Sequence, residues 1–342
     1  MTAVEAGFET PGAFLVGLAG TELEPDDRKM LSCPAVSGAV LFTRNFRSKQ
    51  QLIKLVAEIR CVDSRLLLAV DQEGGPVQRF REDFTPLPAL RKIGICFASD
   101  ADAGLSLAYA HATVMASELR QCGIDMSFAP VLDLYSDSRV IGQRAFAAEA
   151  DVVIRLGRAY VQGMNDSGMV ATLKHFPGHG SVTGDTHTEC PEDRRDAETV
   201  MAVDGRPFAE LLECDRIAVM LSHVRYPRVD GRAADFSSYW INSMLRERLG
   251  FTGCVISDDL GMQAAGQESD IMARAGSAFD AGCDLALVCD PGQARECVSR
   301  WSGPGDSRIA EMLRAQPALR QADLAAMRNK LRNLEHLART ST

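Results

Sequence analysis

Eight short apolar runs, most of them separated by segments of helical pattern, constrain the fold of this chain more than any other feature. Each run is continuous rather than alternating, which is typical of parallel strands buried on both faces. The runs cover residues 13–18, 38–42, 66–70, 124–129, 169–173, 217–221, 254–257 and 285–289. Amphipathic helical spacing is found between them at 49–60, 104–122, 150–167, 198–214, 238–249 and 271–281.

Eight strand–helix units are the number that closes a (β/α)8 barrel. We therefore predict an α/β fold with one TIM-type barrel, regular or irregular, as a single domain over residues 1–342. A doubly wound open sheet is the alternative. Residues 83–95 contain Pro and Gly and are expected to form a long loop. Residues 309–337 are expected to be mostly helical and to pack on the outside of the barrel.

Composition removes several classes of function. The net charge of −9 leaves no basic surface for nucleic acid and argues against an anionic membrane surface. No uninterrupted apolar run approaches the ~20 residues that span a bilayer. Residues 1–11 are polar and acidic, unlike a signal peptide, so the cytoplasm is the expected location. The ten Cys contain no Cys-x-x-Cys pair and are expected to be reduced and mostly buried.

A dense polar cluster follows the fifth apolar run. The chain reads Lys174-His175-Phe176-Pro177-Gly178-His179-Gly180 and then Asp185-Thr186-His187. Three of the six His of the chain fall in this one segment. Turns account for the Gly and Pro residues, but packing gives no reason for a Lys, three His and an Asp at the end of a buried strand. The cluster therefore indicates a functional site.

Ionisable residues also follow other apolar runs at the end where a barrel carries its active site. They are Asp71, Glu73 and Arg79 after the third run, Asp133 and Arg144 after the fourth, Lys174 and His175 at the fifth, His223 after the sixth, and Asp258 and Asp259 at the seventh. One such residue alone is weak support, and Arg144 on its own sequence context is as readily a surface charge. Their recurrence at five strand ends is hard to explain as solvated surface.

The loop after the fifth run, residues 176–195, is long for a compact domain, and such loops are usually functional. Asp185 and His187 stand two residues apart on it and can hydrogen-bond if the backbone turns locally. A carboxylate beside an imidazole fixes the tautomer and raises the pKa of the ring, which suits a proton donor near neutral pH.

These motifs resemble those of bacterial β-N-acetylglucosaminidases of glycoside hydrolase family 3, the single-domain cytoplasmic enzymes of cell-wall recycling. The resemblance rests on the 174–180 segment with its following Asp-Thr-His, on the 70–75 segment Val-Asp-Gln-Glu-Gly-Gly through Arg79, on the 141–144 segment Ile-Gly-Gln-Arg, and on the 257–262 segment Ser-Asp-Asp-Leu-Gly-Met. Together they cover most of the chain and are highly specific.

The resemblance implies a role for each matching residue. Asp258 would be the catalytic nucleophile, and His187, paired with Asp185, the general acid/base. The residues that would hold the sugar in the −1 subsite are Asp71, Arg79, Arg144, Lys174 and His175. Retaining hydrolysis needs a carboxylate below the anomeric carbon and a proton donor above the leaving oxygen, which agrees with these roles.

The chain departs from the family pattern at three positions outside the implied catalytic set. Pro76 stands where Arg is common, and Ala145 and Thr186 stand where Ser is usual. Pro76 is the one expected to change the backbone path toward Arg79.

The resemblance also implies the substrate: an amino-sugar oligosaccharide or muropeptide, with terminal β-GlcNAc on 1,6-anhydro-N-acetylmuramic acid. No cofactor, no metal, no nucleic acid and no membrane partner is expected, and the chain is expected to be a monomer or a weak homo-oligomer. A family-3 phosphorylase remains open, because a His donor that has lost its proton is neutral and repels phosphate less than a carboxylate would.

Two other readings are weaker. A metal-dependent barrel hydrolase could use His175, His179, His187, His223 and an Asp, but the first apolar run has no His and Lys174 would repel a cation. A catalytically inactive sugar-binding barrel disagrees with the intact set of catalytic positions.

Overall fold

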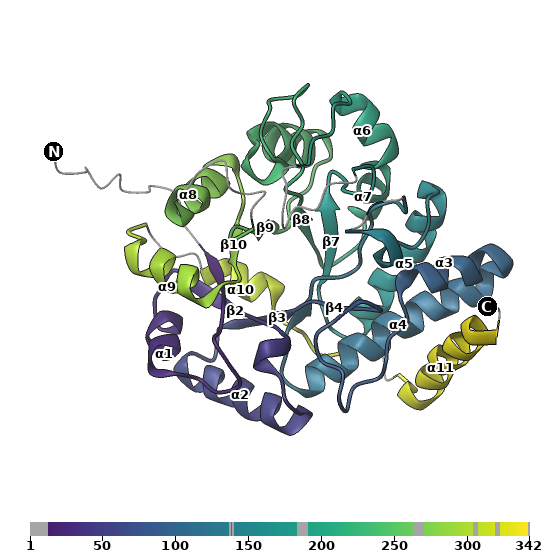
Figure 1. Ribbon diagram of the computed structural model, residues 1–342, viewed down its shortest axis with the longest axis horizontal. Coiled ribbons are helices and arrows are strands. Elements are labelled where there is room, and N and C mark those ends of the chain that lie inside the picture. Colours follow the sequence, from purple (N-terminus) through teal and green to yellow (C-terminus); the bar gives the residue numbers. More distant parts are fainter. Residues whose placement is uncertain are drawn as a thin grey trace.

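The computed structural model describes residues 13–136, 138, 140–182, 191–262, 270–303, 307–318 and 322–340. Eight parallel strands form a ring that is surrounded by helices, which confirms the (β/α)8 barrel (Figure 1). The barrel strands are β1 (Phe14–Gly17), β2 (Val36–Leu41), β3 (Leu67–Val70), β6 (Met126–Ser127), β7 (Ala171–Phe176), β8 (Ile217–Leu221), β9 (Val255–Asp259) and β10 (Leu285–Val288).

The strand order is β6-β3-β2-β1-β10-β9-β8-β7, and every paired neighbour in it is parallel. The two ends of this order meet through isolated parallel bridges, Met126 with Val170 and Val131 with Lys174. The ring is therefore closed, and the open doubly wound alternative is wrong. Residues 124–129 were expected to form the fourth strand, but only Met126 and Ser127 pair with β3, and the chain then turns to bond β7.

The helices lie between the strands and cover them. They are α1 (Pro25–Leu31), α2 (Lys49–Val62), α3 (Leu90–Ser99), α4 (Ala101–Gln121), α5 (Ala150–Asp166), α6 (Ala197–Val203), α7 (Arg206–Leu211), η4 (Tyr239–Arg248), α8 (Ile271–Ala281), α9 (Pro291–Arg300), α10 (Ser307–Leu313) and α11 (Leu324–Thr340). Short 3-10 turns stand at η1 (Thr43–Asn45), η2 (Gly142–Arg144) and η3 (Ala234–Phe236).

Several helices begin where a polar side chain can cap them. Ser48, Asp100 and Asp290 each accept a hydrogen bond from the backbone N–H three residues further on. Gly282 ends α8 in the left-handed conformation, with φ of 115°, which favours Gly. The cap residues therefore explain several helix starts and one helix end.

Two expected elements differ from the structure. The helix expected at 198–214 is divided into α6 and α7, because Gly205 and Pro207 interrupt it and Pro207 stands in the first turn of α7. The loop expected at 83–95 ends early, since α3 begins at Leu90. A small antiparallel hairpin, β4 (Gln72–Gly74) with β5 (Val77–Gln78), follows β3 and was not expected.

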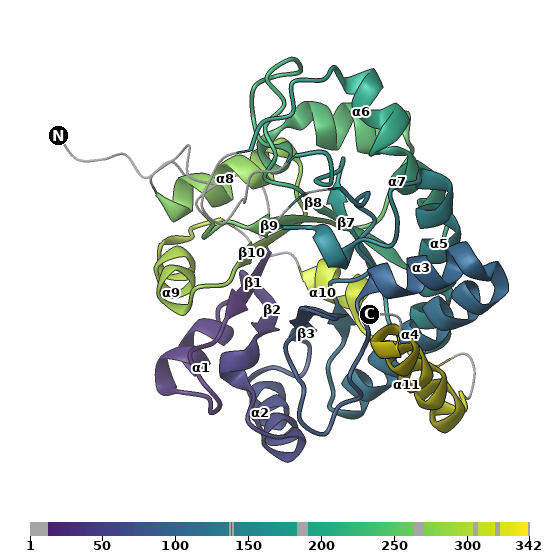
Figure 2. The same cartoon turned by 45° about the vertical axis from the view of Figure 1, so that its right-hand side comes forward.

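Two apolar clusters explain the stability of the barrel. One lies between strands and helices, and the other fills the barrel interior with alternate strand residues such as Leu15, Ala69 and Ile256. Burial on both faces accounts for the continuous apolar runs. As expected, α11 packs outside, against α4. Residues 309–313 differ from the expected outside packing, because Ile309 and Leu313 of α10 join the interior cluster and α10 closes one end of the barrel (Figure 2). No helix among the described residues is long and apolar enough to span a bilayer.

Candidate active site

A single pocket collects the six sequence-predicted site residues that the structure describes. Its lining includes Asp71, Arg79, Arg144, Lys174, His175 and Asp258, together with Glu73, His179 and the apolar side chains of Val77, Val140, Met220, Met262 and Leu287. Asp71 directly follows β3, Lys174 and His175 lie in β7, and Asp258 lies in β9. Asp185 and His187 fall outside the described residues.

Four charged side chains surround Lys174 and form a continuous network. Lys174 Nζ lies 2.9 Å from Asp71 Oδ1 and 2.6 Å from Glu73 Oε1. Arg144 donates two hydrogen bonds of 2.8 Å to the two oxygens of Glu73. Arg79 lies 3.3 Å from the second oxygen of Asp71. Three cations are thus held in fixed positions by two carboxylates.

The cations of this network keep Asp71 and Glu73 ionised. Burial alone would raise the pKa of Asp71 and of Glu73. The charges of Lys174 and Arg79 lower the pKa of Asp71, and those of Arg144 and Lys174 lower the pKa of Glu73, so both pKa values end below the ordinary range. The site therefore presents three cations and two acceptors for the hydroxyl groups of a polar ligand.

Pro76 lies in the turn between β4 and β5, and Arg79 still reaches Asp71.

Asp133 organises the two histidines beside this network. His175 Nδ1 lies 2.7 Å from Asp133 Oδ2, and the backbone N–H of His179 donates to Asp133 Oδ1 at 2.7 Å. Burial would raise the pKa of Asp133, but His175 lowers it below its usual range. The contact orients the ring of His175 at the pocket.

His179 is buried in the pocket wall, and its ring nitrogens have no hydrogen-bond partner among the described residues. Burial lowers the pKa of His179 to about 4, so the ring is neutral near pH 7.

The two adjacent acids of β9 have different environments. Asp258 lines the pocket, and its Oδ1 accepts the backbone N–H of Asp259 at 2.8 Å. Burial would raise the pKa of Asp258, but His223 and His175 lower it below the ordinary value. Asp259 Oδ1 instead accepts the backbone N–H groups of Gly261 and Cys289, each at 3.0 Å, while burial raises its pKa. Asp258 is therefore the anionic acid that faces the pocket, and Asp259 is an acceptor for the backbone.

The described residues before and after positions 183–190 contact the same carboxylate. Before these positions, Ser181 Oγ donates to Asp204 at 2.7 Å, and after them, Arg195 contacts the same carboxylate at 2.7 Å. Gly180 permits the close approach of the backbone there, because a Cβ at this position would lie 2.1 Å from the carbonyl oxygen of Leu134.

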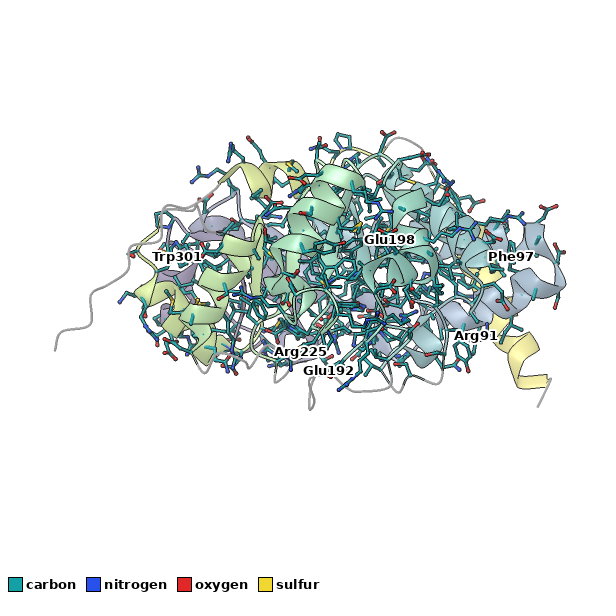
Figure 3. All side chains as sticks on the ribbon, turned by 90° about the horizontal axis from the view of Figure 1, so that it is seen from above. Arg91, Phe97, Glu192, Glu198, Arg225 and Trp301 are labelled. Atoms are coloured by element: carbon teal, nitrogen blue, oxygen red, sulfur yellow. The ribbon has the colours of Figure 1, made fainter. Side chains whose placement is uncertain are left out.

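The chain that follows Asp185 and His187 is also anchored to the loop after β8. Glu192 and Arg225 lie together at one edge of the molecule, 3.4 Å apart (Figure 3). This contact joins the described residues after position 190 to the loop after β8.

Sequence reasoning noted Glu73, Asp133 and His223 at strand ends but gave them no role in the glycosidase reading, and it considered His223 only as a ligand in the metallohydrolase alternative. It missed Asp204 and Asp235 altogether, because each is an isolated acid in a helical or loop segment without a motif. Only the partners that folding brings to them reveal what these residues do. Among the described residues, no group of three or more His, Cys, Asp or Glu side chains is arranged to hold a metal ion.

Comparison with known proteins gives consistent matches over nearly the whole chain. The family described as glycosyl hydrolase family 3 N terminal domain matches residues 10–301. A β-hexosaminidase of Xylella fastidiosa is 48% identical over 290 residues, which are 84% of this chain and 87% of the relative. A β-hexosaminidase of Thiobacillus denitrificans is 45% identical over 335 residues, which are 96% and 93% of the two chains.

A solved structure shares the whole fold. Native NagZ of Neisseria gonorrhoeae superposes with a TM-score of 0.87 at 37% identity, over 96% of this chain and 99% of that one. The gonococcal protein has also been solved in complex with N-trifluoroacetyl-D-glucosamine and with a zinc ion.

Proposed function

The chain belongs to glycosyl hydrolase family 3 and is a glycoside hydrolase of the β-hexosaminidase type, and on this premise we propose that it removes terminal β-linked GlcNAc with retention of configuration. The observation that carries the proposal is the ionised Asp258 beside a cationic pocket. A sugar held by Lys174 and Arg144 would have its anomeric carbon within the reach of an anionic nucleophile on a rigid strand end.

In the first step Asp258 attacks the anomeric carbon. A bond forms between C1 and a carboxylate oxygen, and the bond between C1 and the glycosidic oxygen breaks. The backbone N–H of Asp259 binds one oxygen of Asp258, which leaves the other free to attack. Asp259 does not suit this role, because burial favours its protonated form and its Oδ1 is used by two backbone N–H groups.

His187 gives its proton to the leaving oxygen and then removes a proton from the water that cleaves the covalent intermediate, with Asp185 orienting the ring. One group serves both steps because the second is the reverse of the first in its proton transfer. The tether of Ser181 and Arg195 to Asp204 supports this assignment, because it fixes both sides of the segment that carries the dyad.

The −1 subsite consists of Asp71, Arg79, Arg144, Lys174 and His175. Carboxylate and cationic side chains together can bind vicinal hydroxyl groups, since a hydroxyl both donates and accepts. The apolar side chains of the pocket, Val77, Met262 and Leu287 among them, offer a surface for the acetyl methyl group of GlcNAc. The bound N-trifluoroacetyl-D-glucosamine of the gonococcal relative supports a substrate of this class.

The natural substrate we propose is GlcNAc linked to 1,6-anhydro-N-acetylmuramic acid, with or without peptide. The similarity to NagZ supports this choice, and the pocket accounts only for the terminal sugar.

The test compares p-nitrophenyl β-GlcNAc with the β-glucose and β-GalNAc analogues, each with and without phosphate. We expect cleavage of the GlcNAc substrate that does not depend on phosphate. Formation of GlcNAc-1-phosphate would instead indicate a phosphorylase. Equal cleavage of the glucoside would contradict recognition of the acetamido group.

A further inference from the structure

A buried ion pair lies next to the end of β9, which carries the proposed nucleophile, and the proposed mechanism gives it no role. It consists of His223, which follows β8, and Asp235 in η3, with Nδ1 of the ring 2.7 Å from Oδ2 of the carboxylate. Both side chains are completely buried, and the ring of Phe236 stacks on His223 at 6.2 Å. The pair is held away from water, so its protonation is decided by its neighbours.

The contacts of the His223 ring define where its protons are. Nε2 lies 2.9 Å from the backbone carbonyl oxygen of Asp259, which can only accept, so Nε2 carries a hydrogen. If Nδ1 and the Asp235 carboxylate both lacked a proton, their contact at 2.7 Å would be repulsive, so the pair holds a proton between them. Asp258 and the carbonyl oxygen of Asp259 stabilise positive charge on the ring, which places this proton on Nδ1 and makes the ring an imidazolium.

The charged groups around the ring support the same state. The carboxylates that face His223 are Asp235 from η3 and Asp258 from β9, and the carboxyl group of Asp259 lies further along the same strand end. Burial lowers the pKa of His223, but Asp235 and Asp258 more than offset it and raise the pKa to about 10. An imidazolium with an ionised Asp235 has no net charge, so the pair places a cation near Asp258 without adding an uncompensated buried charge.

We propose that His223 and Asp235 are positioning residues for the nucleophile: the pair holds an imidazolium behind the end of β9, anchors the carbonyl of Asp259, and keeps Asp258 as a carboxylate. This inference rests on the proposed role of Asp258. Besides His223, the groups that face Asp258 are His175 and Lys174 from β7, the Cys289 thiol after β10, and the carboxyl groups of Asp235 and Asp259. Lys174 is shared between Asp71 and Glu73, whereas His223 has one carboxylate partner, Asp235.

The proposal predicts where kcat/KM rises on the acid side of its pH profile. Asp258 must be ionised to attack, so kcat/KM rises with pH through the pKa of Asp258 in the free enzyme. In Asp235→Asn the ring loses the carboxylate that keeps it charged, and His223→Gln keeps a donor toward Asp259 but has no charge. Both variants should raise the pKa of Asp258 and move the acid limb to higher pH by about one unit or more.

Cys283→Ala is the matched control. Cys283 Sγ lies 3.6 Å from the backbone oxygen of Asp235, so the variant disturbs the packing of the same turn without changing a charge. Its acid limb should stay in place. A limb that stays in place in folded Asp235→Asn and in folded His223→Gln, or moves equally in Cys283→Ala, would overturn the proposal.

A second measurement does not require activity. In the whole protein at about pH 8, above the ordinary His pKa of about 6.5, ¹⁵N NMR should show both ring nitrogens of His223 protonated. Asp235→Asn should convert the ring to a neutral form with hydrogen on Nε2. A neutral ring in the wild-type protein overturns the proposal, whether or not the variants fold.

The NMR measurement, combined with covalent labelling of Asp258 by a slow substrate, separates this inference from the proposed function. A protonated His223 in a protein whose Asp258 is never labelled by substrate would overturn the nucleophile. A labelled Asp258 with a neutral His223 would overturn only the pair.

Discussion

Replacement of Glu73 by Gln should destabilise the protein and weaken substrate binding together. The side chain is 1% exposed and bonds Arg144 through both oxygens and Lys174 through one. Gln has nearly the same shape, so the change leaves no cavity. What it removes is the charge that holds two buried cations, and it turns an N–H₂ group toward one of them.

The contacts give the size of the effect. Hydrogen bonds to charged groups contribute about 1.5–3 kcal/mol each, and Gln can still accept through one oxygen. Breaking a buried ion pair by removing one partner costs about 3–5 kcal/mol, because the other charge stays buried. Asp71 still holds Lys174, while Arg144 loses one of its two bonds and its carboxylate partner. We therefore expect a loss of about 3 kcal/mol or more in the free energy of unfolding and a rise in KM.

Urea denaturation measures the stability, and initial rates on p-nitrophenyl β-GlcNAc measure KM. Glu198→Gln is the matched control, because Glu198 also binds an Arg, Arg248, through both oxygens, but both side chains are at least half exposed. Water screens that pair, so the control should keep its stability and its kinetics. Equal stability of Glu73→Gln and Glu198→Gln would refute the reasoning that burial makes the Glu73 contacts strong.

Three further predictions concern the acid/base, metal dependence and pH. His187→Ala should slow a natural disaccharide far more than an activated aryl glycoside, up to the roughly 10²–10⁴-fold contribution of general acid–base catalysis. Azide should restore turnover of the aryl substrate as a β-glycosyl azide, and Asp185→Ala should show a milder form; equal slowing of both substrates would make His187 a binding residue. Activity should survive prolonged treatment with EDTA, whereas loss with recovery on adding zinc would favour a metallohydrolase. Burial lowers the pKa of His111 and of His179 to about 4, below the unfolded value of about 6.5. As the pH falls from about 6.5 to 4, the unfolded chain therefore binds protons first, and the free energy of unfolding should drop by up to roughly 3 kcal/mol for each His. Urea titrations measure this drop, and His111→Gln should remove about half of the part that comes from these two His residues.

The barrel was predictable because its strands are buried on both faces and leave continuous apolar runs. The run at 169–173 overlaps β7 at residues 171–173, and the run at 217–221 matches β8. The fourth strand could not be delimited, because its length depends on the point where the chain leaves β3 to bond β7. The division between α6 and α7 was signalled by Gly205 and Pro207, but the apolar spacing continues across them.

The site was predictable where chemistry is concentrated in motifs. Lys174, His175 and Asp258 stand at strand ends, and the closed barrel brings them to one pocket. Asp235 could not be found in this way, since its partner His223 is 12 residues earlier and only the turn at η3 brings the two together. Residues whose role depends on a tertiary contact leave no pattern in a single sequence.

The most direct test of the account is to identify the residue that becomes covalently attached to the sugar. A fluorinated GlcNAc glycoside with an activated leaving group should form an intermediate that turns over slowly, and peptide mass spectrometry should find the label on Asp258. Asp258→Asn should remain folded, inactive and unlabelled. A label on Asp259, or rapid turnover without any labelled peptide while the wild-type protein is active, would contradict a retaining mechanism with Asp258 as the nucleophile.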